Sequence, residues 1–243
     1  IDLSLGTHNR YGEKMMGAYF NDKNRMMLFG NANNVNDMGF PGGGHRGFGG
    51  GRQGLNAAKM LGMNYNYEKR NKFKIDLSAF WNHSNGDIFS RNTSENFVSS
   101  NGSFSNSIRQ NYSRNNSWNL QGRIEWKPDS MTNIMFRPTA AWSSSDGLTT
   151  SKQASFNEDP YLYTTDPLDD NELEEMDKDG VVVNSQKRNS INYSSNKNVS
   201  GSLQINRKLN TKGRSITVSA NGRFGRSDSK SLSMNATRLW LKQ

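Results

Sequence analysis

The feature that most constrains the fold is a strict alternation of apolar and polar residues between Trp118 and Trp126. Successive side chains of a β-strand point to opposite faces, so a period of two indicates a strand with one apolar and one polar face. The apolar members of this segment are Trp118, Leu120, Gly122, Ile124 and Trp126, and the polar members are Asn119, Gln121, Arg123 and Glu125.

The same alternation recurs in residues 73–81, 199–206 and 215–224. The polar positions are rich in Asn, Ser, Gln and Arg. Each apolar face is about five side chains tall, which corresponds to roughly the ten residues that a tilted strand needs to cross the hydrocarbon layer of a membrane. The pattern therefore predicts transmembrane β-strands.

Composition agrees with this interpretation. Only 32% of the 243 residues are hydrophobic and the mean hydropathy is −0.90, so the hydrophobic content is low for a protein with a buried core. However, 10% of the residues are aromatic, which is a high aromatic content for a disordered chain. A transmembrane barrel resolves the conflict because only every second strand residue meets lipid. No run of about 18 or more apolar residues occurs, which excludes a helical membrane span.

A net charge of +9 is typical of proteins that bind nucleic acid, but the distribution of the charged residues along the chain argues against such a partner. Residues 157–180 hold ten acidic residues and one lysine, and the remainder of the chain holds thirty basic and twelve acidic residues. The basic residues are spread along the expected strands and their turns. This arrangement suits a polar lumen and charged rims, and we expect no nucleic-acid partner.

The connections between the expected strands alternate between short and long, as the periplasmic turns and extracellular loops of outer-membrane barrels do. The long ones lie near residues 33–54, 98–103 and 157–184. We expect about nine strands, at residues 1–7, 10–20, 24–33, 56–67, 72–97, 104–126, 131–156, 185–208 and 213–240. Since bacterial barrels have even strand numbers, nine strands favour a segment of a larger wall. The chain also opens without an initiator Met or signal peptide, so we expect an internal fragment.

Aromatic residues lie at or near the ends of the apolar faces, where girdles anchor a barrel at the two membrane interfaces. The alternative is ordinary packing in a sheet core. The residues concerned are Tyr65, Tyr67, Trp81, Trp118, Trp126, Trp142 and Trp240.

Three motifs have a functional and a simple structural interpretation. The glycine-rich run at residues 42–51 lacks the Gly-Lys-Ser/Thr of a P-loop and the repeated Arg of an RNA-binding tract, which favours a flexible loop. Residues 177–180 resemble half of a calcium loop, but the twelfth position is Arg188 instead of Glu, which favours a solvated loop over a cation site. Tyr161 and Tyr163 could stack on a ligand such as a sugar or pack the loop.

We find no catalytic constellation. The chain contains no cysteine, the spacing of His8, His45 and His83 suits no metal site, and no G-x-S-x-G elbow occurs. We therefore expect neither an enzyme nor a bound cofactor or metal. The candidate ligand contacts are confined to the acidic loop and are Tyr161, Tyr163, Asp166, Asp169, Asp170, Asp177 and Asp179.

The run from Tyr19 to Asn36, above all Phe29-Gly30-Asn31-Ala32-Asn33-Asn34, is followed by a glycine-rich loop and an expected strand at residues 57–67. It resembles the barrel of TonB-dependent receptors from Bacteroidetes, with the motif-level match covering mainly residues 11–67. The resemblance implies a barrel of about 22 strands that imports an unidentified nutrient across the outer membrane. The implied partners are the outer-membrane bilayer, a surface lipoprotein, and the TonB complex acting through a plug region that this sequence does not contain.

Two hypotheses follow. The first is an all-β antiparallel transmembrane barrel wall that belongs to a receptor or transporter, whose purified form requires detergent. The second is a soluble, basic β-rich module that binds glycan or nucleic acid through Arg and Tyr on long hairpins, whose binding to polyanions is sensitive to salt.

Overall fold

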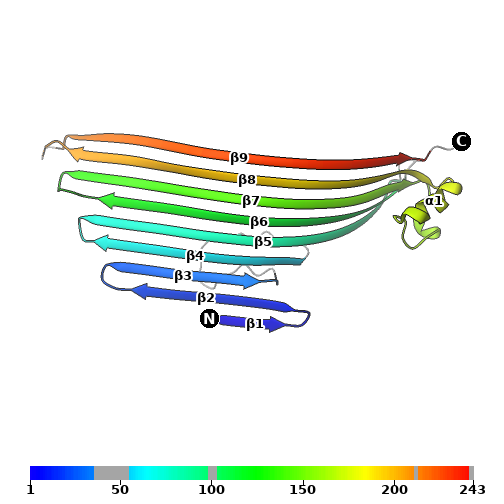
Figure 1. Ribbon diagram of the computed structural model, residues 1–243, viewed down its shortest axis with the longest axis horizontal. Helices are drawn as coiled ribbons and strands as arrows, with labels where there is room; N and C mark the ends of the chain where they lie inside the picture. The colour runs from blue at the N-terminus through cyan, green and yellow to red at the C-terminus, as the bar shows by residue number, and fades with distance from the viewer. Residues whose placement is uncertain (36–54, 98–102, 211–212, 241–243) are drawn as a thin grey trace. The chain divides into compact units, whose positions relative to one another are not determined.

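The chain is built almost entirely of β-strands. The computed structural model describes residues 1–35, 55–97, 103–210 and 213–240, and the side chain of Leu55 lies outside this description (Figure 1). The strands form one antiparallel sheet of nine strands that is not closed, in which each strand pairs with its neighbours in sequence. The strands are β1 (Asp2–Gly6), β2 (Arg10–Phe20), β3 (Asn24–Asn33), β4 (Leu55–Lys69), β5 (Phe73–Glu95), β6 (Phe104–Trp126), β7 (Thr132–Phe156), β8 (Val182–Lys208) and β9 (Ser215–Leu239).

The prediction of an all-β chain with nine antiparallel strands is confirmed. The largest change in a strand boundary is at β8, which begins at Val182 instead of residue 185. The side chain of Val182 is buried, so packing extends this strand beyond its alternating part. Between β7 and β8 lie a 3-10 helix, η1 (Pro160–Leu162), and an α-helix, α1 (Asp170–Lys178), neither of which was predicted.

Tight turns join several strand pairs. Between β1 and β2, His8 and Asn9 have φ angles of 59° and 57°, which is the paired left-handed conformation of a two-residue hairpin turn. Between β2 and β3, the side-chain oxygen of Asn21 accepts hydrogen bonds from the backbone N–H groups of Lys23 and Asn24 at 3.0 and 2.6 Å. The first connection is thus as short as the second, so the predicted alternation of short and long connections was wrong at this point.

Backbone pairing fixes which side chains share a face. Met26 of β3 lies opposite Tyr65 of β4, and Leu28 lies opposite Met63. Tyr19 of β2 lies opposite Met26 on its other side. Apolar positions therefore meet apolar positions across neighbouring strands, as the alternation predicts.

The chain divides into two compact units. The first comprises residues 1–85, 114–145 and 194–229, and its described regular elements are strands alone. The second comprises residues 86–113, 146–193 and 230–243 and includes η1 and α1. Strands β5 to β9 each contribute residues to both units.

Two sequence predictions fall outside the described residues. The glycine-rich run at residues 42–51, with His45, is one of them, and the greater part of the loop near residues 98–103 is the other.

Candidate functional site

One face of the first unit is apolar and exposed. Buried hydrophobic side chains are almost missing from its described residues, where only Ala58 qualifies. Leu77 and Trp142 lie on the inner strands β5 and β7 and are still 39% and 40% exposed, and Val199 of β8 is 57% exposed. Nothing among the described residues of this unit covers these side chains. In a soluble sheet protein, large apolar side chains on inner strands are usually buried.

Side-chain contacts show that these apolar residues share one face. A Cβ placed on Gly122 would lie 3.3 Å from Leu77 Cδ2 and 2.9 Å from Pro138 Cγ, and one placed on Gly201 would lie 3.1 Å from Phe136 Cε2. Alternation then extends the face along each strand. We call this surface the apolar face, and on β5 to β9 it comprises Phe73, Ile75, Leu77, Ala79, Trp81, Trp118, Leu120, Gly122, Ile124, Trp126, Ile134, Phe136, Pro138, Ala140, Trp142, Val199, Gly201, Leu203, Ile205, Ile216, Val218, Ala220, Gly222 and Phe224.

A row of indole rings crosses three neighbouring strands at one end of the apolar face. The centroid of Trp118 lies 5.9 Å from that of Trp81, with a 36° angle between the ring planes, and 5.9 Å from that of Trp142, with a 24° angle. Trp81 Nε1 donates a hydrogen bond to Asn116 Oδ1 at 2.7 Å, and its ring stacks on His83. We call Trp81, Trp118 and Trp142 the tryptophan row.

The opposite face of the first unit is polar and internally hydrogen-bonded. Thr139 and Ser200 join their hydroxyl groups across β7 and β8 at 2.6 Å, and Arg223 Nε donates to Asn198 Oδ1 across β8 and β9 at 3.1 Å. Such cross-strand pairs satisfy polar groups within the sheet. We call this surface the polar face.

The polar face carries a shallow hollow of about 480 Å³. Asn66 Nδ2 donates to Asp76 Oδ1 at 2.7 Å within it. A mixture of amides and both charge signs gives the hollow hydrogen-bonding capacity without a strong net charge. Its polar side chains are Arg25, Asn64, Asn66, Asp76, Ser78, Gln121 and Arg123.

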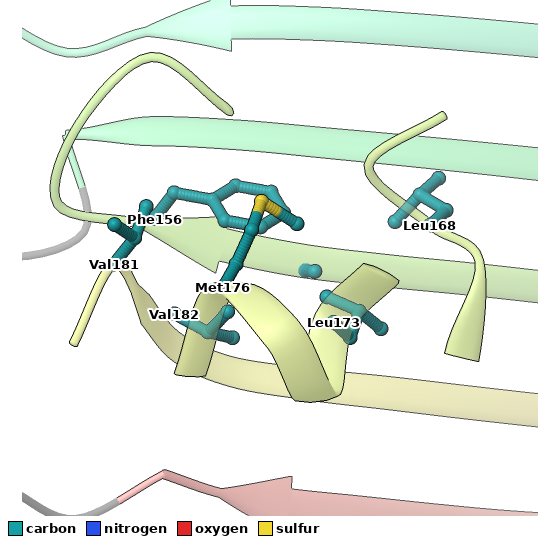
Figure 2. Close-up of a cluster of buried hydrophobic side chains, with 7 residues drawn as sticks. Phe156, Leu168, Leu173, Met176, Val181 and Val182 are labelled. Atoms are coloured by element: carbon teal, nitrogen blue, oxygen red, sulfur yellow. The ribbon is translucent and has the colours of Figure 1, made fainter. Parts of the chain in front are cut away.

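The acidic segment predicted as a ligand loop is folded in the second unit around a small hydrophobic core. Phe156 is fully buried, and Figure 2 shows its ring beside Met176, with Leu173 on the same helix and Leu168 on the segment before it. Val181 and Val182 close the cluster where the chain returns to β8. This segment therefore has a fixed conformation that buried apolar contacts maintain.

Helix α1 has capping interactions at both ends. The Asp169 carboxylate accepts hydrogen bonds from the backbone N–H groups of Asn171 and Glu172, which satisfies donors that the first turn leaves free. At the other end Gly180 has a φ of 70°, and the N–H of Val181 donates to the Met176 carbonyl at 3.1 Å. This is the Schellman arrangement, in which glycine takes the left-handed position.

The calcium-like sequence at residues 177–180 is therefore the end of a helix. Asp177 lies in the last turn of α1 and Asp179 is its C-cap. Among the described residues, no group of three or more His, Cys, Asp or Glu side chains is arranged to hold a metal ion.

Three acidic side chains pair with basic residues of the strands. Arg91 Nη2 of β5 lies 3.1 Å from Asp166 Oδ1. Lys152 Nζ of β7 lies 3.2 Å from Asp170 Oδ1 and also donates to the Leu168 carbonyl at 3.4 Å. The third pair joins Arg238 Nη1 of β9 to Glu174 Oε1 at 3.0 Å. In each of the three pairs at least one of the two side chains is more than half exposed, so each pair contributes little to stability.

Tyr161 and Tyr163 flank the exposed tip of the segment. The hydroxyl of Tyr161 lies 3.4 Å from Thr93 Oγ1, and that of Tyr163 donates to Glu158 Oε2 at 2.7 Å. The hydrogen bond to Glu158 raises the pKa of Tyr163 above 10.0, with desolvation and the charges of Glu158 and Asp179 acting in the same direction. Both rings remain partly exposed, and Leu162 between them is 77% exposed.

The seven predicted ligand residues thus lie on one folded segment, with several of them engaged in its own structure. Asp166 and Asp170 form ion pairs, Asp169 caps α1, and both tyrosine hydroxyls have hydrogen-bonding partners. Sequence reasoning missed the basic partners Arg91, Lys152 and Arg238 because they are distant in sequence. It also missed α1, although Asp169 followed by Glu172 is a capping-box pattern that could have revealed the helix.

Two comparisons with known proteins found no match. No protein-family model matches the chain, and neither does any curated protein. Within the described part of the chain, no helix combines the length and apolar character needed to cross a membrane.

Proposed function

We propose that the first unit is part of the wall of a transmembrane β-barrel in the bacterial outer membrane, with the apolar face toward lipid and the polar face toward the lumen. The observation that carries this proposal is the exposed apolar face on the inner strands β5 to β8, where Leu77 and Trp142 remain about two-fifths exposed. A surface of this kind is costly in water and favourable in a bilayer.

The dimensions of the apolar face support the proposal. On β6, Trp118 and Trp126 bound the apolar alternation and are eight residues apart in sequence. At about 3.3 Å per residue this corresponds to roughly 26 Å along the strand, or about 20 Å along the membrane normal for a strand tilted by about 40°. This length covers most of the apolar band, which is about 25 Å tall in outer-membrane barrels. The tryptophan row then lies at one edge of the band, as an interfacial girdle does.

The second unit differs in character, which fits an aqueous environment. It has a buried core around Phe156, and its helix is capped and carries acidic side chains. Folding of this kind follows the rules of soluble proteins, in which apolar groups are buried and charges face solvent. We propose that the acidic segment of this unit faces the cell exterior, as the longer loops of outer-membrane barrels do.

The outer edges of β1 and β9 would need to pair with further strands in a membrane. Each pairs on one side only within the described sheet. Unpaired backbone groups are expensive in lipid, and a closed barrel removes them. Strands from outside this sheet would complete the barrel.

The more specific part of the proposal is a TonB-dependent receptor that imports a nutrient. It rests on the resemblance of residues 19–36 and of the strand that follows to the barrels of such receptors. The TonB complex, acting through a plug region, and a surface lipoprotein would be its partners. Ligand contact is assigned to the exposed side of the acidic segment, at Tyr161 and Tyr163 with Asp177 and Asp179.

Heat-modifiability tests the barrel. The full-length protein is extracted from membranes with detergent and run on a gel with and without boiling. A faster-migrating unboiled form that shifts on heating is expected, because closed barrels resist detergent until they are heated. Free solubility without detergent, together with the absence of a shift, would contradict the barrel and favour the soluble binding module.

Uptake tests the receptor. A labelled nutrient that cells accumulate through this protein should no longer enter when TonB is deleted. Uptake that persists without TonB would leave the barrel in place and overturn the receptor assignment.

A further inference from the structure

The tryptophan row ends beside a lysine on the next strand. Thr139 and Ser200 are hydrogen-bonded across β7 and β8, both on the polar face. The strands are antiparallel, so three steps from Thr139 to Trp142 match three steps from Ser200 to Lys197. Lys197 therefore lies across from Trp142, and both are on the apolar face because three steps reverse the side.

A second cation lies on the following strand at the same level. Ser227 Oγ donates to Asn196 Oδ1 at 2.5 Å across β8 and β9, again on the polar face. The residues next to them in sequence, Lys197 and Arg226, must then both point to the apolar-face side. A Cβ on Gly225 would lie 3.5 Å from the Lys197 carbonyl oxygen, which confirms that the two segments are adjacent.

The two cations differ in how they are paired. Arg226 Nε lies 2.9 Å from Asp228 Oδ2, and both side chains are largely exposed. The side chain of Lys197 is exposed and forms no hydrogen bond or ion pair with any described residue. Lys197, Arg226 and Asp228 together carry one net positive charge, and the ammonium group of Lys197 forms no ion pair with a described residue.

Apolar side chains lie directly beneath this pair. Val199 follows Lys197 on the apolar face of β8, and Phe224 precedes Arg226 on β9, with 57% and 77% of their surfaces exposed. The order along each strand is thus an apolar residue and then a cation, next to the interfacial ring of Trp142. A lipid with an anionic headgroup has the complementary order, because its acyl chains end at a phosphate.

We propose that Lys197 and Arg226 bind the phosphate group of a membrane lipid whose acyl chains lie against Val199 and Phe224. This inference rests on the proposed function, since it requires the apolar face to lie in a bilayer. It adds a partner that the barrel alone does not require, because a barrel wall can meet neutral lipid equally well.

Fluorescence quenching by brominated lipids tests the inference. The full-length protein is reconstituted in bilayers of phosphatidylcholine that contain either brominated phosphatidic acid or brominated phosphatidylcholine. Phosphatidic acid is expected to quench tryptophan fluorescence at lower mole fraction, and Trp142→Phe should remove most of this excess. Each of Lys197→Gln and Arg226→Gln should lower the relative affinity for phosphatidic acid by about fivefold.

Arg223→Gln is the matched control. Arg223 lies three residues from Arg226 on the same strand but bonds to Asn198 on the polar face, so its removal should leave lipid preference unchanged. The heat-modifiability gel shows that each variant still folds. Inorganic phosphate at millimolar concentration should not displace the lipid.

The outcomes separate the two proposals. Equal quenching by the two lipids, or a preference that survives in the Lys197→Gln/Arg226→Gln double variant, overturns the lipid site and leaves the barrel intact. Displacement by inorganic phosphate overturns the lipid as the source of the phosphate. No quenching by either lipid overturns the membrane wall itself.

Discussion

Phe29 lies against Gly62 of the neighbouring strand so closely that a Cβ on Gly62 would be 2.2 Å from the Phe29 Cζ atom. The two residues are paired in register across β3 and β4. The Phe29 ring extends over the glycine and reaches Phe80 of β5, with 6.5 Å between the ring centroids. Glycine at this position thus provides space for an aromatic ring on the polar face.

Gly62→Ala should therefore displace the Phe29 ring and weaken this part of the sheet. Overpacking of this kind typically lowers the free energy of unfolding by about 1–3 kcal/mol. The measurement is urea unfolding of the protein in lipid or detergent. Gly17→Ala is the control, because a Cβ on Gly17 would meet nothing within 4 Å, and it should be neutral. An equal loss in both variants would show that strand propensity, and not the Phe29 contact, decides the effect.

Phe156 should determine whether the acidic segment stays folded. Its side chain is fully buried among Met176, Val181 and the other members of the cluster. Phe156→Ala removes a ring from a packed core, which costs about 3–5 kcal/mol. Limited proteolysis should then cleave residues 157–181 much faster than in the unmodified protein. Leu162→Ala, at a side chain that is 77% exposed, should leave the rate nearly unchanged. A resistant Phe156→Ala variant would mean that other contacts hold the segment.

The ion pairs of the same segment should matter less than this core. The Arg91–Asp166 and Arg238–Glu174 pairs are about half exposed on both sides, and Lys152–Asp170 is exposed at Asp170. Exposed pairs contribute about 0–1 kcal/mol each. The triple variant Asp166→Asn/Asp170→Asn/Glu174→Gln should therefore increase the rate of proteolysis less than Phe156→Ala does. If the triple variant proves the more sensitive, electrostatic attraction dominates the fold of this segment.

The sequence predicts the strands well because their signal is local. In β6 every second residue between Trp118 and Trp126 is apolar, and no competing pattern exists there. Helix α1 is different. Its nine residues include five acidic ones and only Leu173 and Met176 as buried apolar positions, so its amphipathic pattern is weak. What decides its structure is packing on Phe156, which lies at the end of β7 and outside the local sequence of the helix.

The arrangement of the candidate sites was less predictable for the same reason. The aromatic residues at the ends of the apolar face could be named from sequence, but the stacking of Trp118 on Trp142 depends on the register between β6 and β7. The position of Lys197 beside Trp142 likewise follows from the pairing of Thr139 with Ser200. Register arises from cross-strand packing and turn geometry, which a single strand does not contain.

The turn between β6 and β7 should respond to acid through Asp129. Its carboxylate accepts hydrogen bonds from the Met131 backbone N–H at 2.7 Å and from Thr132 Oγ1 at 3.0 Å. The bond from Met131, aided by those from Thr132 and by the charge of Arg207, holds the pKa of Asp129 below 3.8. A carboxyl group whose pKa is lowered by folding stabilises the folded turn above pH 3.8, and this stabilisation is lost as the pH falls through the lower, folded-state pKa.

The measurement is the pH dependence of the Asp129 carboxyl carbon chemical shift in the labelled protein, which should have its midpoint below 3.8. Thr132→Ala should move the midpoint only part of the way back, because the bond from Met131 is the larger cause. In Asp129→Asn the side-chain amide oxygen still accepts the hydrogen bond from the Met131 N–H, but the amide group does not titrate. The destabilisation of this turn at low pH should therefore disappear. A midpoint at or above 3.8 in the unmodified protein would show that the carboxylate does not hold this turn through the Met131 bond.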